Sequence, residues 1–256
     1  MLSANDVKAL LDDKARQYES PNFIVEDPIS VPHLFSRRSD IEIAGLLAAT
    51  IAWGNRKAIV RSARQMISLL GECPTDFVLN ASETDIARLD TFVYRTFQQD
   101  DLPGIVCALR SIYSREAEDA LESIFAPRFG ETIKDGIARF RDAMLPSLSQ
   151  RTFKHIADVR KGAAAKRLNM FLRWMVRSSA RGVDFGLWKS IAPSDLVMPL
   201  DVHTASVGRC LGLILRKQND WKAATELTNS LREFDPHDPV RYDFALFSLG
   251  INEHFA

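Results

Sequence analysis

Lysine and arginine residues are concentrated in one part of the chain, residues 151–181. This segment holds nine of them against one acidic residue, Asp158, and so carries a net charge of +8. The whole chain has 33 Lys and Arg and 33 Asp and Glu, so the other residues carry −8. Basic surfaces bind polyanions because each phosphate contact releases counterions. The segment therefore indicates a phosphate-bearing partner. The zero net charge of the whole chain does not indicate such a partner.

The spacing of three of these residues predicts one charged helix face. On a helix that begins near Ala163, Lys166, Arg173 and Arg177 lie within about 40° of one another at ~100° per residue. The opposite arc carries apolar residues that we expect in the core: Leu168, Phe171, Leu172, Met175 and Val176. Clustered like charges destabilise a helix slightly, and a bound polyanion reverses the sign of that cost. The alternative is a solvated face whose charges pair with acids elsewhere in the fold.

Apolar residues recur at helical spacing through nearly the whole chain, and alternating β-branched runs and Asn-Gly hairpins are missing. The sequence therefore predicts an all-α fold of about ten helices. Expected helices after the first hundred residues cover 102–114, 116–127, 131–144, 163–178, 202–213, 221–234 and 239–250. Helix starts are expected at Ser3, at the possible capping boxes Ser39–Glu42 and Ser82–Asp85, and at Asp238 before Pro239. From the start at Ser82, a buried stripe of Ile86, Leu89, Val93 and Phe97 is expected.

The domain organisation expected from the sequence is simple. Residues 1–38 form an N-terminal helix and an irregular arm containing Pro21, Pro28 and Pro32. Residues 39–256 form one α-helical domain, with two lobes as the alternative. No linker has the composition of an inter-domain tether.

Several classes of protein are excluded. The three cysteines are far apart, so the sequence predicts neither a zinc ribbon nor an iron–sulfur cluster. It predicts no metal site and no cofactor. The amino terminus lacks the apolar core of a signal peptide, and no run reaches the ~18 apolar residues that a membrane span needs. We therefore expect a cytoplasmic protein that does not bind membranes, and its oligomeric state is left open.

One segment resembles a known DNA-repair motif. Residues 162–173, GAAAKRLNMFLR, resemble the second half of the helix–hairpin–helix motif of DNA glycosylases (HhH-GPD superfamily), particularly the archaeal 8-oxoguanine type. In those proteins a Gly-x-Gly-x-Lys hairpin opens a helix that runs on to Phe-Leu-Arg. Gly162 and Lys166 fall in that register, whereas Ala164 replaces the second glycine. The hairpin motif is expected at about 155–178.

Three further segments extend the resemblance over roughly residues 40–250. PLDVHTASVGR at 199–209 resembles the segment in which an aspartate opens the next helix, expected here at about 200–213. Residues 238–250 resemble the closing helix of that fold. LAATIAWGNR at 47–56 sits where relatives carry the turn that probes the DNA stack. The interval between Lys166 and Asp201 is longer than usual, as expected of an uncharacterised bacterial branch of the superfamily.

The resemblance implies excision of bases from damaged or abasic duplex DNA, with Lys166 as nucleophile and Asp201 as its acidic partner. A carboxylate stabilises the positive charge that develops on the sugar, and a lysine amine can form a Schiff base that permits strand cleavage. The target base would have to leave the duplex. The resemblance further implies two sets of residues. DNA contacts are expected at Asn55, Arg56, Arg160, Lys161, Gly162, Arg167, Arg173 and Arg177. Structural roles are expected at His203 and at Arg209, which should pair with a carboxylate.

Less specific roles remain open for the same residues. Lys166 fits a phosphate contact, Asp201 a plain helix cap, and Asn55 a turn or cap residue. The function expected first is a DNA glycosylase-like enzyme, with or without AP-lyase activity. The alternatives are a non-catalytic DNA-binding module on the same scaffold and an interaction protein with no role on nucleic acid.

Overall fold

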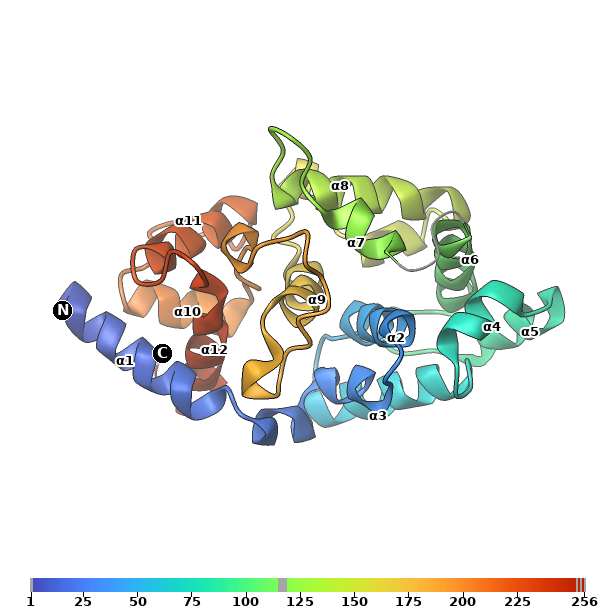
Figure 1. The fold of residues 1–256 in the computed structure, drawn as a ribbon, viewed down its shortest axis with the longest axis horizontal. Helices are drawn as coiled ribbons and strands as arrows, with labels where there is room; N and C mark the ends of the chain where they lie inside the picture. Colours follow the sequence, from blue (N-terminus) through green and yellow to red (C-terminus); the bar gives the residue numbers. More distant parts are fainter. Residues whose placement is uncertain (1, 115–118, 252, 254, 256) are drawn as a thin grey trace. The chain divides into compact units, whose positions relative to one another are not determined.

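The computed structural model describes every residue except 1, 115–118, 252, 254 and 256. Within that part of the chain it has twelve α-helices, ten 3-10 helices and, in place of strands, two isolated β-bridges (Figure 1). This confirms the all-α prediction. The chain divides into two compact units, which we call unit 1 (residues 1–25 and 158–256) and unit 2 (residues 26–157). The division does not fall at residue 38, because the N-terminal helix belongs to unit 1.

Unit 2 is built around a helix that is buried along nearly its whole length. This helix, α2 (Arg38–Thr50), packs against α3 (Arg56–Ser68) and α4 (Pro74–Asn80). The others are α5 (Glu83–Ala87), α6 (Asp101–Tyr113), α7 (Ala120–Phe125) and α8 (Ile133–Met144). The first residues of the helix expected at 116–127 lie outside the described residues.

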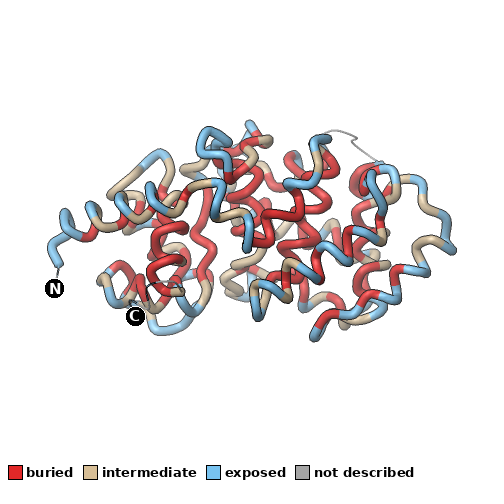
Figure 2. Tube along the Cα trace, turned by 90° about the horizontal axis from the view of Figure 1, so that it is seen from below, coloured by how far each residue is buried: buried red, intermediate tan, exposed pale blue. Residues whose placement is uncertain are grey.

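Unit 1 carries three of the four segments that resemble glycosylases, and the fourth, residues 47–56, lies in unit 2. Its helices are α1 (Ala4–Tyr18), α9 (Lys166–Val176), α10 (Val202–Cys210), α11 (Trp221–Arg232) and α12 (Asp243–Ile251). Helix α12 packs against both α1 and α10. Along α9 every residue from Leu168 to Val176 is buried. Helix α1, next to the N-terminus, alternates between buried and exposed positions (Figure 2).

The capping predictions divide according to where each side chain finds its partner. Ser3 and Ser82 open α1 and α5 with capping boxes, as predicted. The helix expected at Ser39 is present and begins at Arg38, but its capping box is absent. The Ser39 hydroxyl accepts from Thr75, and the Glu42 carboxylate accepts from Arg38 and Tyr113. At Asp238 a helix begins as predicted, with Pro239 at its first position, but it is a 3-10 helix, η10 (Pro239–Tyr242). The Asp238 side chain pairs with Arg177 and does not cap it.

The buried stripe expected after Ser82 is only partly present. Helix α5 ends at Ala87 and a 3-10 helix, η4 (Arg88–Thr91), follows it. Leu89 and Phe97 are buried, but Val93 is exposed because the chain has left helical geometry before it.

Candidate functional site

A tight hairpin precedes the helix that carries Lys166. A 3-10 helix, η7 (Val159–Lys161), ends at Gly162, which has a φ of 87°. Ala165 then adopts a φ of 52°, and α9 begins at the next residue, Lys166. A left-handed backbone is costly for alanine because its Cβ crowds the following carbonyl. The strained position is therefore Ala165, not Ala164, where the related hairpins carry glycine.

The hairpin is tied to α11 and is not preceded by an α-helix. Trp221 donates its backbone N–H to the Gly162 carbonyl at 2.9 Å. Upstream lie η7 and another 3-10 helix, η6 (Thr152–His155), and the nearest α-helix before them is α8 in unit 2. The motif expected at 155–178 therefore contains one α-helix, α9, rather than two.

Asp201 is the N-cap of α10. Its Oδ1 accepts hydrogen bonds from the backbone N–H groups of His203 at 3.0 Å and Thr204 at 2.9 Å. Helix α12 approaches closely here, since a Cβ added at Gly250 would lie 3.1 Å from the Cβ of His203. The two cap hydrogen bonds hold the Asp201 carboxylate in place, and its second oxygen faces Lys166.

The structure brings Lys166 and Asp201 together across 35 residues of sequence. Nζ of Lys166 lies 3.8 Å from Oδ2 of Asp201, and the two side chains are 27% and 22% exposed. Both groups stand at helix N-termini, where partial positive charge favours anions. The arrangement places an amine and a carboxylate within reach of one external molecule.

A buried ion pair, which the sequence did not indicate, lies behind these two residues. Asp243 opens α12 and pairs with Nη1 of Arg173 at 2.5 Å. Burial raises the pKa of the Asp243 carboxyl; the charges of Arg173 and Lys166 partly oppose this, and that of Asp201 adds to it. Asp243 therefore lies within electrostatic range of both members of the candidate pair. Nothing in its own segment distinguishes it from a helix-capping aspartate.

The exposed basic face predicted on α9 is wrong. Arg173 and Arg177 are 3% and 4% exposed, respectively. Arg173 lies 3.3 Å from Asp184, and its guanidinium carbon is 4.3 Å from the centre of the Phe244 ring. Because both arginines are enclosed by acids and apolar groups of unit 1, they are not available to DNA phosphates. Of the three residues expected on that face, only Lys166 reaches the surface.

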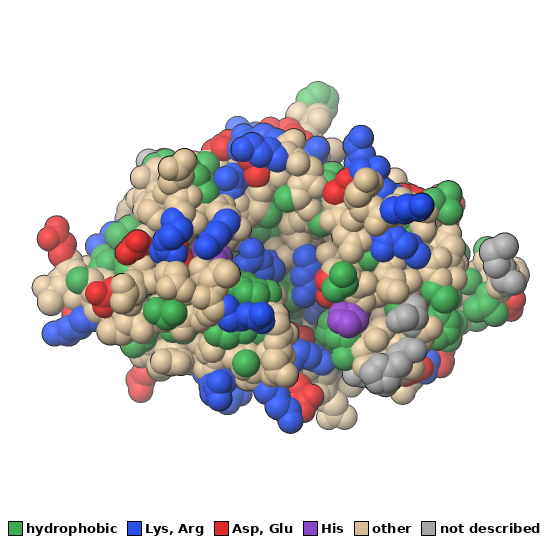
Figure 3. All heavy atoms as spheres, turned by 180° about the vertical axis from the view of Figure 1, so that it is seen from behind, with side chains coloured by type: hydrophobic (Ala, Val, Ile, Leu, Met, Phe, Trp, Pro, Cys, Tyr) green, Lys and Arg blue, Asp and Glu red, His purple; other side chains and the backbone are tan. Residues whose placement is uncertain are grey.

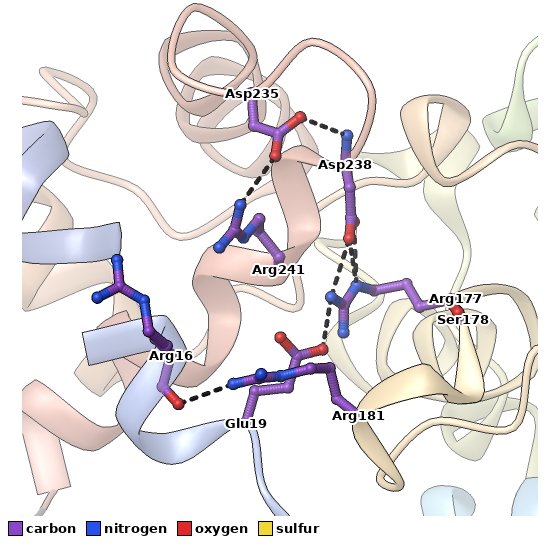
Figure 4. Close-up of a pocket in the computed structure, with 8 residues that line it drawn as sticks. All are labelled: Arg16, Glu19, Arg177, Ser178, Arg181, Asp235, Asp238 and Arg241. Carbon is purple, nitrogen blue, oxygen red and sulfur yellow. Dashed lines mark hydrogen bonds and ion pairs between the residues drawn. The ribbon is translucent and has the colours of Figure 1, made fainter. Parts of the chain in front are cut away.

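Arg177 holds three carboxylates at once. Nε lies 3.0 Å from each oxygen of Asp238, Nη1 lies 2.5 Å from Asp184 and Nη2 lies 2.7 Å from Glu19. Figure 4 shows the Arg177 guanidinium between Asp238 and Glu19. Pairing with internal acids, the alternative considered from the sequence, is therefore what both arginines do.

The other basic residues expected at DNA lie around the hairpin. Arg160 is exposed and lies 3.5 Å from Asp158, and Lys161 is exposed. Gly162 is partly exposed and forms the turn beside them. Burial lowers the pKa of the Arg167 guanidinium to about 10, so it stays cationic at neutral pH. On the face drawn in Figure 3, Lys and Arg side chains are spread over the surface with Asp and Glu among them.

The remaining predicted residues have structural contacts. In unit 2, Asn55 caps α3 by accepting from the Ala58 N–H, and Arg56 lies 3.1 Å from Asp27. In unit 1, Arg209 donates to the carbonyls of Arg216 and Lys217 and to the side chain of Asn219. The expected carboxylate partner of Arg209 is therefore replaced by the loop after α10. His203 is exposed, and its backbone N–H contributes to the Asp201 cap.

Two further properties bear on the class of protein. In the described part of the chain, His, Cys, Asp and Glu side chains form no group of three or more that could hold a metal ion. None of the helices formed by these residues is long and apolar enough to cross a membrane.

The fold and the site define an all-α protein in which a lysine at the start of one helix faces an aspartate that caps another. The chain belongs to a family of proteins of unknown function, DUF2400, which matches residues 27–252. Neither the curated proteins nor the solved structures include a match to it. The resemblance to helix–hairpin–helix glycosylases therefore depends on the sequence segments alone.

Proposed function

We propose that the protein is a DNA glycosylase-like enzyme that excises bases, with Lys166 as nucleophile and Asp201 as its acidic partner. The observation that carries the proposal is the 3.8 Å approach of Lys166 Nζ to Asp201 Oδ2 on a partly exposed surface. Since Oδ1 of Asp201 is occupied by the two N–H groups of the cap, the lysine faces the one oxygen that can act on a substrate.

The reaction assigns one task to each residue. The neutral amine of Lys166 bonds to C1′ of the target nucleotide, the glycosidic C–N bond breaks, and the base leaves with the electron pair and takes a proton from water. The Asp201 carboxylate stabilises the positive charge that builds on the sugar and accepts the proton that the amine loses. Opening of the sugar ring then gives a Schiff base, from which the 3′ phosphate can be eliminated.

The surroundings of the pair support a nucleic-acid substrate. Arg160 and Lys161 are exposed in the hairpin that leads into α9, and the N-terminus of α9 favours phosphate. Arg173 and Arg177 do not contribute to this surface, because they are enclosed in the core. We therefore propose a small DNA-contacting surface centred on residues 160–167.

Borohydride trapping tests the nucleophile. The unmodified protein is incubated with duplexes that carry 8-oxoguanine, uracil or an abasic site, and covalent adducts are separated by denaturing electrophoresis. We expect an adduct with at least one substrate, its loss in Lys166→Ala, and its retention in Lys57→Ala, the control that removes an exposed lysine on α3, outside the proposed surface. An adduct that persists in Lys166→Ala would show that another amine reacts.

A second variant tests the carboxylate without removing the helix cap. Asparagine is as good an N-cap as aspartate, so Asp201→Asn keeps the two backbone hydrogen bonds and removes the charge. Base release should fall roughly 10²-fold or more if the carboxylate stabilises the transition state. If the unmodified protein binds duplex DNA but releases no base from any lesion, it is the non-catalytic DNA-binding module instead.

A further inference from the structure

A cavity of about 350 Å³ lies at the other end of α9. It is formed within unit 1 by the end of α1, the segment after α9, and the loop and first turn around η10 (Figure 4). Arg177 follows Lys166 by eleven residues, so the two sites are about 16 Å apart along the helix at a rise of 1.5 Å per residue. Eight residues line the cavity, and half of them are arginines: Arg16, Glu19, Arg177, Ser178, Arg181, Asp235, Asp238 and Arg241.

The acidic residues of this cavity are already largely engaged. Both oxygens of Asp238 accept from Arg177. Asp235 accepts from the backbone N–H groups of His237 and Asp238 through Oδ1, and from Arg241 through Oδ2. Glu19 accepts from Arg177 through Oε1. The carboxylates therefore serve mainly to hold the walls together.

Three of the four guanidinium groups, those of Arg16, Arg181 and Arg241, retain most of their donors. An arginine has five N–H donors. Arg241 uses one on Asp235, and Arg181 uses one on the Arg16 carbonyl at 3.0 Å. Among the described residues, the Arg16 side chain makes no hydrogen bond and neither Arg16 nor Arg181 has a carboxylate within 4.0 Å. Figure 4 shows the side chains of Arg16, Arg181 and Arg241 around one opening. The cavity thus offers many donors and two cations that carboxylates do not neutralise.

We propose that this cavity binds a small phosphomonoester, with its phosphate held by Arg16, Arg181 and Arg241. A phosphomonoester carries about −1.5 to −2 charges at neutral pH, and its oxygens accept the paired N–H donors that these three arginines retain. The four arginines of the lining outnumber its three carboxylates, which leaves it a net positive charge. The volume is near the lower end of the ~300–1,000 Å³ found for ligand sites, so the ligand is no larger than a mononucleotide. This inference does not depend on the proposed function, because the cavity is separate from Lys166 and Asp201.

Calorimetric titration of the full chain tests the proposal, with thymidine 5′-monophosphate and inorganic phosphate as probes at constant ionic strength. Both should bind and compete with each other, whereas thymidine should not bind. Arg16→Gln should weaken both probes roughly tenfold, because a charge-assisted hydrogen bond is lost. Arg64→Gln is the matched control, since it removes the same charge from an exposed position on α3, and it should leave the affinity unchanged.

Other results would overturn the proposal. Failure of both probes to bind in the low-millimolar range, or equal losses in Arg16→Gln and Arg64→Gln, would leave only nonspecific attraction. A duplex with a 5′-terminal phosphate is the second arm: Arg16-dependent binding of this duplex without binding of the nucleotide would assign the phosphate to DNA and not to a small molecule. Arg241→Lys keeps the charge but removes the planar fork, and its affinity should also fall.

Discussion

Replacing Arg177 by methionine should strongly destabilise the protein. The guanidinium is 4% exposed and is shared by Asp184, Asp238 and Glu19. Burial alone would lower the pKa of Arg177, but the negative charges of these three carboxylates outweigh burial and hold its pKa above the ordinary range. Methionine fills a similar volume without charge, so the three carboxylates would lose their common cation.

The size of the effect follows from the number of charges left behind. Removal of one partner from a buried ion pair costs about 3–5 kcal/mol, because the other charge stays desolvated. Only Arg173 would remain as a cation next to Asp184, and it is already engaged by Asp243. We therefore expect a loss near 4 kcal/mol of unfolding free energy, which lowers Tm by roughly 8–16 °C in a chain of this size. That is a large part of the ~5–15 kcal/mol that stabilises a typical domain.

Urea and thermal unfolding followed by circular dichroism measure this loss. Arg64→Met, at an exposed position on α3, is the control and should change stability by less than about 0.5 kcal/mol. The double variant with Asp184→Asn should lose less than the sum of the single variants, because neutralising Asp184 relieves the excess negative charge. If Arg177→Met unfolds like the unmodified protein and instead binds DNA less tightly, the arginine belongs to an exposed DNA-binding face and the reasoning is refuted.

Two further predictions concern a strained residue and a helix cap. Ala165→Gly should stabilise the protein by up to about 1 kcal/mol, because glycine adopts the positive φ of that position without strain. Ala164→Gly should instead destabilise it by about 0.5–1 kcal/mol. Equal effects of the two substitutions in urea unfolding would contradict this prediction. Hydrogen bonds from Thr132 lower the pKa of Asp135 in the folded state, so its contribution is complete above the unfolded pKa of ~4 and is lost as pH falls through the folded value. Asp135→Asn should therefore show a shallower fall of the urea midpoint below about pH 4 than the unmodified protein, and an identical acid profile would exclude this role.

Features decided within a few residues were predictable from the sequence. The boxes at Ser3 and Ser82 form because both partners lie within one helical turn. The all-α class was likewise predictable, because the helical spacing of apolar residues can be recognised without knowing what each helix contacts. The box at Ser39 does not form, because the Glu42 carboxylate accepts from Arg38 and from Tyr113, 71 residues further along the chain. A capping signal therefore predicts the capping hydrogen bonds only when no other donor competes for the carboxylate.

The candidate site was predictable only in part. The resemblance indicates Lys166 and Asp201, but the 3.8 Å approach of their side chains depends on how α9 and α10 pack in unit 1. Asp243 lies 42 residues beyond Asp201 and has no local signal of its own. The arginine-lined cavity could not be predicted either, because its lining residues are far apart in the sequence: Arg16 comes from α1 and Arg241 from near the other end of the chain.

The charge of residues 151–181 has a different meaning once its partners are known. Two arginines four residues apart on an apolar helix are compatible with an exposed phosphate-binding face and with a buried ion network alike. The acids decide between these structures, and for Arg177 they come from Glu19, Asp184 and Asp238. Part of the −8 carried by the rest of the chain is therefore the internal counter-charge of the basic segment. Because these acids neutralise Arg173 and Arg177, the C-terminal half of α9 offers no positive charge to a polyanion, and along this helix such charge is left only in the hairpin before it and in its first turn.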